Sequence, residues 1–395
     1  MPTLCIQVEA KTPRSLWDPC ARGVNPVPFV CAYGLTWEPN SQVLGGILPK
    51  FLRLISFGND FNQPIATLLW PVNLQQLEFG RDFNQPIEAV KWPDSLRSIT
   101  FKRDFNHPIE RVRWPESLSK LRFYGRFNQP VAEVVWPERL QQLLFCQFNH
   151  PIADSVWPAS LLEIEFGDSF NQPIERVAWP ASTCELRFGY EFNQPIEGVL
   201  WPPSLRELDF DGDFDQPIDG AVWPASLERL LLGDFDRSIN DIKWPVSLLQ
   251  LHFIVGFNQP INNVAWPTFL QELSFGHNFD QDVAGVTWPD SLQEMSFYGQ
   301  GLGPIDGIVW PASLRRLTLA GNFNQPILDV SWPASIRHLM FGEDFDQPVV
   351  GVVWPASLQR LVFGSKFDQQ LVGFVWPDSL EQIWVQAVVH NRCSL

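Results

Sequence analysis

The sequence predicts a solenoid, in which short coils of similar length stack on one another, and two repeated motifs carry this prediction. Trp-Pro occurs fifteen times from Trp70 to Trp376, and successive copies keep the spacing of Trp70 and Trp92 except for two shorter steps. Phe-Asn-Gln-Pro-Ile, in its best form, keeps the same register from Phe61 onward, and the single residue missing from each short step lies just before Phe148 and Phe235. Self-similarity at a fixed short period is the signature of a repeat architecture. We therefore expect one repeat solenoid of about sixteen coils of 21-22 residues rather than several globular domains.

The consensus of one unit, W-P-x-S-L-x-x-L-x-F-G-x-x-F-N-Q-P-I-x-x-V-x, predicts the elements of each coil in order. Leu-x-x-Leu-x-Phe alternates apolar with polar residues, which is typical of a short strand with one buried face. Proline cannot donate to a strand ladder, so both prolines belong at corners or on an unpaired return path. Each coil should hold one short parallel strand, a turn at Gly and Asn, an extended convex return through I-x-x-V and a turn at Trp-Pro, with little helix. A single coil cannot bury its own apolar residues, so neighbouring coils must share one core.

The repeat divides the chain into three segments. Residues 35-385 form the predicted solenoid, preceded by an N-terminal cap segment over 1-34 and followed by a C-terminal tail over 386-395. A strand-like copy at Leu52–Phe57 comes before the first Trp-Pro, and a shortened, degenerate unit begins at Leu35. We expect these two copies to open the stack.

The motif Phe61-Asn62-Gln63-Pro64-Ile65 resembles the hallmark of the FNIP repeat, a unit of the leucine-rich-repeat class. The resemblance covers roughly residues 35-385 and implies a leucine-rich-repeat-like stack with one parallel strand per coil. This chain departs from the usual pattern at the Trp before each Pro, where Leu is more typical, which suggests a wider hydrophobic corner. Such repeats are scaffolds attached to many activities, so the resemblance says little about a specific function.

The leucine-rich-repeat class also implies a structural role for the motif Asn. A buried amide is expected to use both its donor and its acceptor on backbone groups of its own and the next coil, which forms a ladder. Asp takes this place in five later coils, and because a carboxylate cannot donate, the ladder should be weaker there or exposed to water. The expected structural ladder consists of Asn62, Asn84, Asn106, Asn128, Asn149, Asn171, Asn193, Asn258 and Asn324, with Asp215, Asp236, Asp280, Asp346 and Asp368 as the substitutes. A calcium site on the Asp row is the alternative, but the Gly-rich, Asp-dense turns that bind calcium in other solenoids are missing.

Composition and charge argue against several classes of partner. Lys and Arg number 28 against 44 Asp and Glu, which gives a formal net charge of −16, whereas nucleic acid and anionic membranes require a basic face. No apolar run approaches the roughly 18 residues that a membrane-spanning helix needs. The start at Met1 lacks the basic-then-apolar pattern of a secretory signal. We expect a cytoplasmic protein that binds neither nucleic acid nor membrane.

Cysteine and histidine indicate no catalytic or metal centre. The chain has no C-x-x-C pair, so zinc lacks ligands at a recognisable spacing. Cys5, Cys20 and Cys31 are reduced thiols or the source of one cap disulfide, and the sequence leaves both open. No Ser/His/Asp or Cys/His arrangement recurs at one place, and serines such as Ser95 and Ser313 are better explained as turn caps than as nucleophiles. We expect no enzyme activity, no cofactor and no metal.

The side chains between the buried Leu and Phe of each strand point outward, and they suggest the function. A face built from many parallel strands is broad and rigid, and surfaces on rigid scaffolds are where binding evolves. The predicted function is therefore a non-catalytic scaffold for protein-protein interaction. The expected partner-binding residues form an acidic cluster that would receive a basic segment of an unknown protein: Glu163, Glu165, Glu185, Glu207, Asp209 and Asp211. A solvated face is the alternative explanation of this cluster, with Arg187 lowering its internal repulsion.

Two other functions stay open. Some FNIP-repeat proteins resemble substrate adaptors of ubiquitin ligases with an N-terminal F-box, although the segment Leu16–Pro19 is too short and too Pro-rich for that helical module. A structural or surface-binding protein is the other alternative. If the acidic cluster binds no partner, the apolar strand positions around Met340, Val362 and Trp384 are the next candidates. The sequence identifies neither the partner nor the oligomeric state.

Overall fold

The computed structural model describes residues 34-37, 48, 50-371 and 376-385. It forms two compact units, unit 1 (Met1–Ser169) and unit 2 (Phe170–Leu395). Most of the expected cap segment over 1-34 and the whole expected tail over 386-395 lie outside the described residues. Cys5, Cys20 and Cys31 lie there as well, so the cap disulfide stays a prediction.

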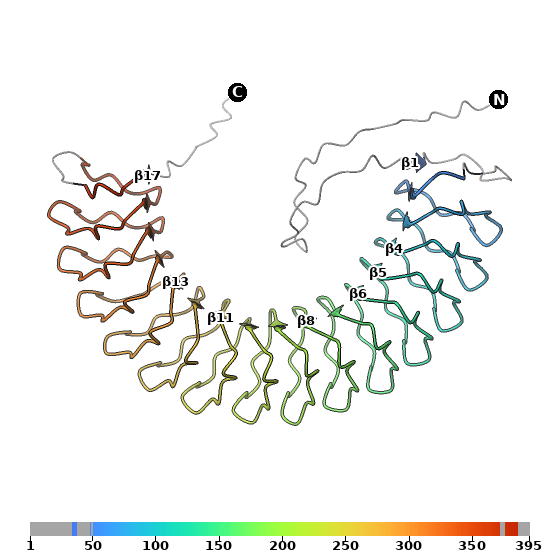
Figure 1. Cartoon of the computed structure of the whole chain (residues 1–395), viewed down its shortest axis with the longest axis horizontal. Coiled ribbons are helices and arrows are strands. Elements are labelled where there is room, and N and C mark those ends of the chain that lie inside the picture. Colours follow the sequence, from blue (N-terminus) through green and yellow to red (C-terminus); the bar gives the residue numbers. More distant parts are fainter. Residues whose placement is uncertain (1–33, 38–47, 49, 372–375, 386–395) are drawn as a thin grey trace. The chain divides into compact units, whose positions relative to one another are not determined.

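Unit 1 holds seven described strands, each parallel to the next one along the chain (Figure 1). They are β1 (Gly34–Trp37), β2 (Leu54–Phe57), β3 (Gln76–Glu78), β4 (Ser98–Phe101), β5 (Lys120–Phe123), β6 (Gln142–Phe145) and β7 (Glu163–Glu165). Phe123 lies opposite Phe145, which is a full repeat step, whereas Leu144 lies opposite Glu165, which is one residue less. The short step therefore follows β6, as the motif spacing predicts.

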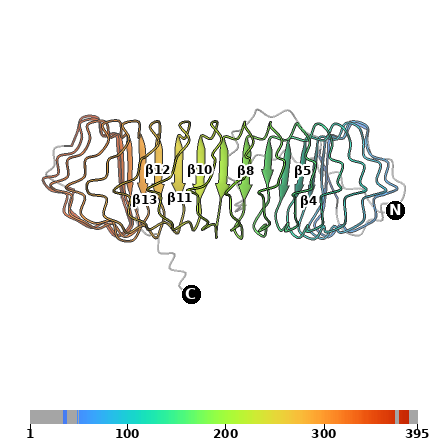
Figure 2. The same cartoon turned by 90° about the horizontal axis from the view of Figure 1, so that it is seen from below.

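Unit 2 holds ten described strands with the same consecutive parallel pairing, and Figure 2 shows several of them side by side. They are β8 (Glu185–Phe188), β9 (Glu207–Phe210), β10 (Arg229–Leu232), β11 (Gln250–Phe253), β12 (Glu272–Phe275), β13 (Glu294–Phe297), β14 (Arg316–Leu319), β15 (His338–Phe341), β16 (Arg360–Phe363) and β17 (Gln382–Val385). Leu232 lies opposite Phe253, so the second short step follows β10. The described residues contain no helix, and the predicted parallel solenoid with its regular short period is confirmed.

The strands are short because each coil offers only four alternating positions before glycine and proline interrupt the pattern. In β9, Leu208 and Phe210 are fully buried, while Glu207 and Asp209 point outward and are half-buried. The same alternation recurs in most strands of both units, as a strand with one buried face requires. The second and fourth residues of these strands therefore form an aligned core. The first and third residues form two outward rows of variable side chains.

Columns of stacked aromatic rings fill the core of each unit. In unit 1, the Phe101 ring lies 4.1 Å from Phe105 in its own coil and 5.4 Å from Phe123 in the next coil, measured between centroids. In unit 2, Phe210 lies 4.3 Å from Phe214 and 5.4 Å from Phe188. Offset stacking at these distances adds about 0.5 to 1.5 kcal/mol per pair to the free energy of area burial. The columns explain why Phe rather than Leu occupies two positions of the repeat.

The tryptophans form the wide hydrophobic corner that the sequence suggests. Trp92 and Trp114 stack with centroids 6.3 Å apart, and Trp266 and Trp288 with centroids 5.9 Å apart. Trp354 is 8% exposed, and its buried indole N–H has no hydrogen-bond acceptor among the described residues. The corner is therefore stabilised by buried ring area and not by indole hydrogen bonds.

The motif Asn residues form a cross-coil ladder, but the ladder lies at the surface. In unit 1 the Oδ1 of Asn62 accepts a hydrogen bond from the backbone N–H of Asn84 at 2.9 Å, and also one from the side-chain amide of Gln85. Asn62 and Asn84 are both exposed, whereas the sequence predicted a buried amide. Pro64 inside the motif explains this position, because a turn that contains proline cannot join the ladder of the sheet.

The hydrogen bonds of this ladder use the acceptor oxygen, so Asp replaces Asn without loss of the bond. Asp236 accepts from the N–H of Asn258 at 2.8 Å, the same geometry as in unit 1. The N–H of Asp368 and the amide of Gln369 donate to Asp346 and hold its pKa below the ordinary value, because both bonds favour the charged form. The expectation that Asp weakens the ladder through a missing donor therefore has no support in these contacts.

The serines of W-P-x-S form a second ladder. Ser95 Oγ donates to the carbonyl of Leu74 at 2.7 Å, and Ser313 Oγ donates to the carbonyl of Leu292 at 2.6 Å. In both cases the acceptor belongs to the preceding coil, not to the turn that carries the serine. Two ladders of hydrogen bonds therefore join neighbouring coils. The serine ladder lies in the turns before the strands, and the Asn ladder lies in the turns after them.

One coil of unit 2 breaks both the aromatic column and the Asn ladder. Gly301 takes the place of the motif Phe, while Leu302 takes the place of Asn and is 3% exposed, so this segment still buries one apolar side chain. Leu302 offers no side-chain acceptor to the next coil, and Gly303, which takes the place of the motif Gln, has no side-chain amide to donate to the preceding coil. Leu319 also replaces Phe in the strand that follows. The sequence predicts that this coil is the least protected interior unit, and the buried Leu302 makes the expected defect milder than an empty site would be.

Candidate functional site

The outward side chains of the strands form a broad surface that varies from coil to coil in the described part of unit 2, and we call this surface the strand face. It has two rows, which hold the first and the third residue of each strand. The first row runs Glu185, Glu207, Arg229, Gln250, Glu272, Glu294, Arg316, His338, Arg360 and Gln382. The second row runs Arg187, Asp209, Leu231, His252, Ser274, Ser296, Thr318, Met340, Val362 and Trp384.

The predicted acidic cluster is divided between the units. Glu163 and Glu165 point outward from β7 in unit 1, and the other four residues belong to unit 2. Glu185 lies opposite Glu207, and Asp209 lies in the second row of the same strand as Glu207. Asp211 follows β9, is exposed, and accepts a hydrogen bond from the N–H of Gly212 at 2.9 Å. Asp211 therefore belongs to a turn and not to the strand face.

Two arginines neutralise part of the acidic cluster in unit 2. Arg187 forms an ion pair with Glu185 and lies 4.0 Å from a carboxylate oxygen of Glu207. Arg229 lies 3.7 Å from the same carboxylate oxygen. The sequence identified Arg187 as a neutralising residue but missed Arg229. The contact of Arg229 depends on the register of β9 and β10, which places it opposite Glu207. The strand face from β8 to β10 therefore carries charges of both signs in contact with one another.

The middle of the strand face brings together a histidine and a serine that the sequence did not connect. His252 Nδ1 lies 2.8 Å from Ser274 Oγ across neighbouring strands. Burial and the charge of Arg229 lower the pKa of His252 to about 4. A general base works best when its pKa is near the working pH, so this pair favours a structural hydrogen bond over nucleophilic catalysis.

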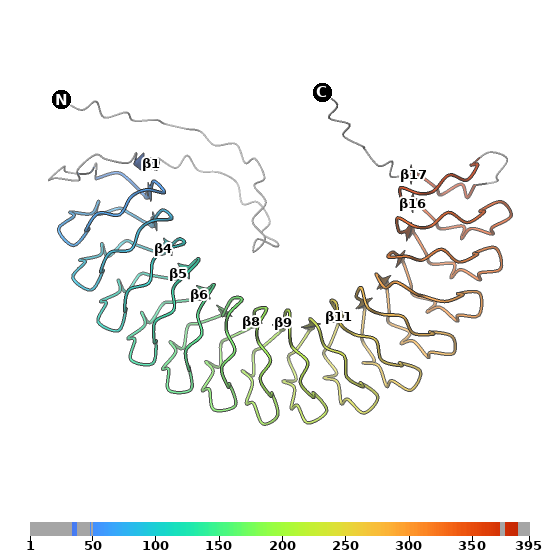
Figure 3. The same ribbon diagram turned by 180° about the vertical axis from the view of Figure 1, so that it is seen from behind.

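Basic and apolar side chains gather on the strand face from β14 to β17, and two of these strands, β16 and β17, are labelled in Figure 3. Arg316 pairs with Glu294 at 2.8 Å, and the guanidinium carbon of Arg360 lies 5.9 Å from the ring centroid of Trp384. Trp384 is 54% exposed, in contrast to the buried corner tryptophans. Val362 is 5% exposed although it occupies an outward position, so the second row already carries covered apolar surface here.

A groove borders this part of the strand face. Its volume is about 540 Å³, and it lies where the Trp-Pro-x-Ser turns lead into the strands. Arg315 and Arg337 line it together with Gln271, Gln293 and a row of serines. The sequence could have identified these two arginines, since Arg315 and Arg337 each occupy the position directly before a strand. The groove adds two cations to the edge of the strand face.

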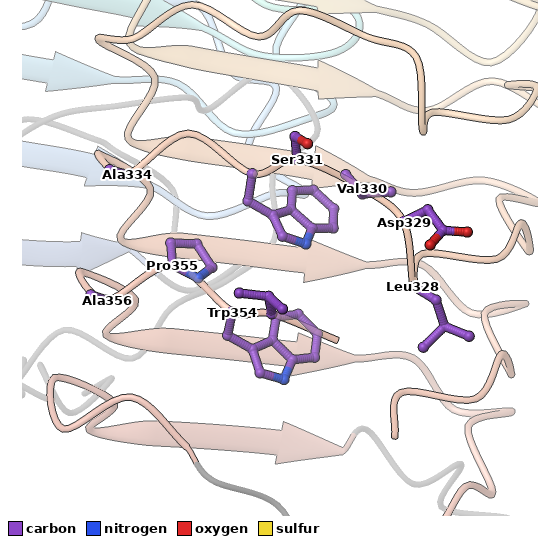
Figure 4. A pocket seen from close by; sticks show the side chains of 10 residues that line it. Leu328, Asp329, Val330, Ser331, Ala334, Trp354, Pro355 and Ala356 are labelled. Atoms are coloured by element: carbon purple, nitrogen blue, oxygen red, sulfur yellow. The ribbon is translucent and has the colours of Figure 1, made fainter. Parts of the chain in front are cut away.

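A second hollow, of about 450 Å³, lies at the tryptophan corner of neighbouring coils (Figure 4). Leu328, Val330, Trp354 and Pro355 line it, and Asp329 and Ser331 supply its polar side chains. Most of its lining belongs to the repeated corner itself. The hollow offers few groups that could select a ligand.

The described residues contain no group of three or more His, Cys, Asp or Glu side chains that could hold a metal ion. Nor does this part of the chain include a helix long and apolar enough to cross a membrane. Cys146 and Cys184 are half-buried thiols in separate units. The strand face, with its adjoining groove, is therefore the candidate functional site.

Comparison with known proteins connects this geometry to a repeat family. A model described as the FNIP repeat matches residues 39-82, 68-104, 148-191 and 192-235. The crystal structure of CroV588, described as a novel circular leucine-rich-repeat protein, is similar with 35% sequence identity and a TM-score of 0.68. The match covers 86% of this chain and 57% of CroV588, so this chain spans less than two thirds of that relative.

A chain of the Toll-Spatzle complex, a molecular hub in Drosophila development and innate immunity, is similar with a TM-score of 0.57 and 12% identity. That match covers 86% of this chain and 52% of the other, and at this identity it shows the fold alone. No curated protein matches the chain in sequence.

Proposed function

The chain is an FNIP-repeat protein with a leucine-rich-repeat-like solenoid, and on that premise we propose that it is a non-catalytic scaffold that binds a partner protein through its strand face. The leucine-rich-repeat fold is typically used for protein binding. The observation that carries the proposal is the contrast between a nearly invariant core and two outward rows that change from coil to coil. Fixed backbones with variable side chains are the arrangement that rigid recognition surfaces use.

The rigidity of the strand face supports this function. Backbone bonds join neighbouring strands, the Asn and Asp ladder joins the turns after them, and the serine ladder joins the turns before them. A preorganised surface loses little conformational entropy when a partner binds, which improves affinity.

Catalysis is not the function that these residues favour. The one contact between a candidate nucleophile and a candidate base that we identify on the described strand face is Ser274 with His252, and the low pKa of His252 makes it a weak base. An adaptor for ubiquitin ligases would use the strand face in the same way, to hold a substrate protein. It is therefore a special case of the proposed scaffold.

The acidic cluster remains one candidate contact, for a Lys/Arg-rich segment of a partner. Glu207 is shared between Arg187 and Arg229, so only part of the negative charge is available in unit 2. A basic partner would have to compete with these arginines. We expect its contribution to affinity to be modest and to fall with rising salt.

Site-specific photo-cross-linking tests the scaffold. A photoreactive residue at Ser296 on the strand face is compared with one at Thr287, an exposed position on the return path of the coil that leads into β13. The proposal predicts that partner proteins cross-link to the chain modified at Ser296 and not to the chain modified at Thr287. Cross-linking confined to Thr287 would exclude the strand face as the binding surface.

A further inference from the structure

We propose that the strand face from β14 to β17, with its adjoining groove, is a docking site for an acidic protein segment that also carries apolar side chains. The inference rests on the proposed scaffold function and names its partner chemistry. We call the site the basic patch, and it consists of Arg315, Arg316, Arg337, His338, Met340, Arg360, Val362 and Trp384.

The register of the strands gathers the charges of the basic patch. Arg316 lies opposite His338, and His338 lies opposite Arg360, so the three side chains occupy the first row of consecutive strands. Neighbouring strands are about 4.8 Å apart, which puts the backbones of Arg316 and Arg360 about 10 Å from each other. Arg315 and Arg337 come one residue earlier and open into the groove of about 540 Å³. Four guanidinium groups therefore lie along one edge of the strand face.

Most of these cations have no acidic partner within the described chain. Arg316 pairs with Glu294, but no ion pair joins Arg315, Arg337 or Arg360 to any described residue. Other arginines, such as Arg53, also lack an ion pair among the described residues, but Arg315 and Arg337 come from consecutive coils and line one groove. Carboxylates of a partner would supply the missing counter-charges, and the planar guanidinium group binds a carboxylate through two parallel hydrogen bonds.

A neutral histidine between two arginines limits the electrostatic repulsion within the basic patch. Burial, followed by the charges of Arg316 and Arg360, lowers the pKa of His338, so its imidazole is neutral near pH 7. His338 thus separates two cations without adding a third. A bound carboxylate would favour the protonated imidazole, which gives the basic patch one more positive charge when it is occupied.

Apolar side chains lie directly beside the charges. Met340, Val362 and Trp384 follow one another in the second row, and the exposed Trp384 ring lies close to the guanidinium of Arg360. Trp and Arg are enriched among the residues that dominate binding energy at protein interfaces. The expected ligand therefore combines carboxylates with at least one aliphatic or aromatic side chain.

The surroundings favour an acidic protein segment over nucleic acid. A nucleic acid carries phosphates along its whole length, and those outside the basic patch would meet the acidic remainder of the chain. A short protein segment can confine its negative charge to the patch. Its apolar side chains also give Trp384 and Met340 a role that a phosphate backbone would not.

The test selects short random peptides that are displayed on phage and bind the full chain, and then measures the affinity of the enriched peptides for two double variants. Arg315→Glu with Arg337→Glu reverses two charges of the basic patch. Arg53→Glu with Arg97→Glu is the matched control, because both residues are exposed, precede a strand and have no ion pair among the described residues. Circular dichroism of each variant establishes that the strands are retained.

The expected result is enrichment of peptides that combine Asp or Glu with apolar residues. Their affinity should fall at least about tenfold in the Arg315/Arg337 variant and stay unchanged in the control, with a marked salt dependence. Enrichment of basic or uncharged peptides, equal loss in both variants, or equal binding of a single-stranded DNA oligonucleotide would overturn the proposal. Self-association abolished by the Arg315/Arg337 pair would identify a second copy as the occupant and would also overturn it.

Failure of this inference is distinguishable from failure of the scaffold function. If peptides cross-link to the chain modified at Ser296 but bind the Arg315/Arg337 variant with unchanged affinity, the strand face remains the binding surface. Only the proposed role of the basic patch is then excluded. Peptides that cross-link at Thr287 alone would exclude both.

Discussion

Two stretches of the strand face in unit 2, from β8 to β10 and from β14 to β17, share the same parallel backbone and differ in how their charges are used. In the first, Glu185 and Glu207 are paired with Arg187 and Arg229. In the second, Arg360 lies near the Trp384 ring and has no ion pair among the described residues. Charge that is already paired within a chain must be separated before a partner can use it, which costs free energy. The number of charged residues along a repeat therefore does not locate a binding site. Which of those charges are already paired within the chain is the better guide.

Each stretch holds both Phe and Leu at the last strand position, and truncation of one such residue in each stretch has the largest expected effect. Phe210→Ala should cost about 4 kcal/mol of unfolding free energy, because it removes a buried ring from a stacked column. Leu319→Ala should cost about 3 kcal/mol, since that side chain is equally buried but has no ring to stack. Denaturant unfolding followed by tryptophan fluorescence measures both. A larger cost at Leu319 would contradict the role given to the aromatic column.

A titratable histidine between the two stretches makes stability depend on pH. The pKa of His252 is about 4 in the folded chain against an ordinary value of 6.5, because burial and Arg229 disfavour the charged ring. Between these values the unfolded chain binds the proton and the folded chain does not, so stability falls as the pH drops from 6.5 to 4. The loss should amount to about 2 to 3 kcal/mol.

His252→Gln isolates this contribution from that of neighbouring acids. Burial raises the pKa of Glu272, and its effect on stability has the opposite sign, so the total pH dependence of the wild type is a mixture. The variant should lose less stability than the wild type between pH 7 and about pH 4.5. Identical pH profiles of the melting temperature would exclude a neutral, half-buried His252.

Restoring one missing hydrogen bond of the ladder is a smaller perturbation just before β14. Gly303→Gln introduces the side-chain amide that other coils use to donate to the preceding coil, as Gln281 does to Asn258, and a Cβ atom at Gly303 would meet no other atom within 4 Å. We expect a gain of about 1 kcal/mol and slower amide exchange over residues 298-308. Gly307→Gln is the matched control, because that position is equally open but lies outside the ladder. A gain of the same size in both variants would mean that the effect comes from loss of glycine flexibility and not from the restored hydrogen bond.

Charge reversal in the first stretch has the smallest expected effect on stability. Glu207→Lys with Asp209→Lys breaks the contacts of Glu207 to Arg187 and Arg229, and exposed ion pairs contribute less than about 1 kcal/mol each. If the acidic cluster binds a Lys/Arg-rich segment, the variant should lose that partner while its melting temperature stays close to that of the wild type. Retention of every partner would return these residues to the role of a solvated face.

The sequence predicted the fold well because the repeat constrains it many times over. The alternation in Leu-x-x-Leu-x-Phe, the position of both prolines and the two short steps each correspond to a feature of the strands and their register. The exposed ladder was not predicted, because the resemblance to the leucine-rich-repeat class implies a buried Asn, whereas Pro64 inside the motif keeps this turn out of the sheet. Burial of an amide depends on the path of the turn, which the repeat alone does not determine.

The candidate site was harder to predict because it depends on contacts between coils. Glu185, Glu207 and Asp209 occupy outward strand positions that the alternation identifies, whereas Arg315 and Arg337 lie just before their strands, outside that alternation. Only the register shows that Arg229 lies beside Glu207 and that Arg360 lies on the strand next to that of Trp384. Aligning the coils on their strand positions and pairing neighbouring rows would have found both.

Hydrogen exchange of the full chain with and without an enriched acidic peptide tests the central claim most directly, because it reports both stretches of the strand face in one measurement. The account predicts slower exchange over β14–β17 and the turns that hold Arg315 and Arg337, with no change over β8–β10. Protection of β8–β10, or protection confined to the return segments around Thr287, would contradict it.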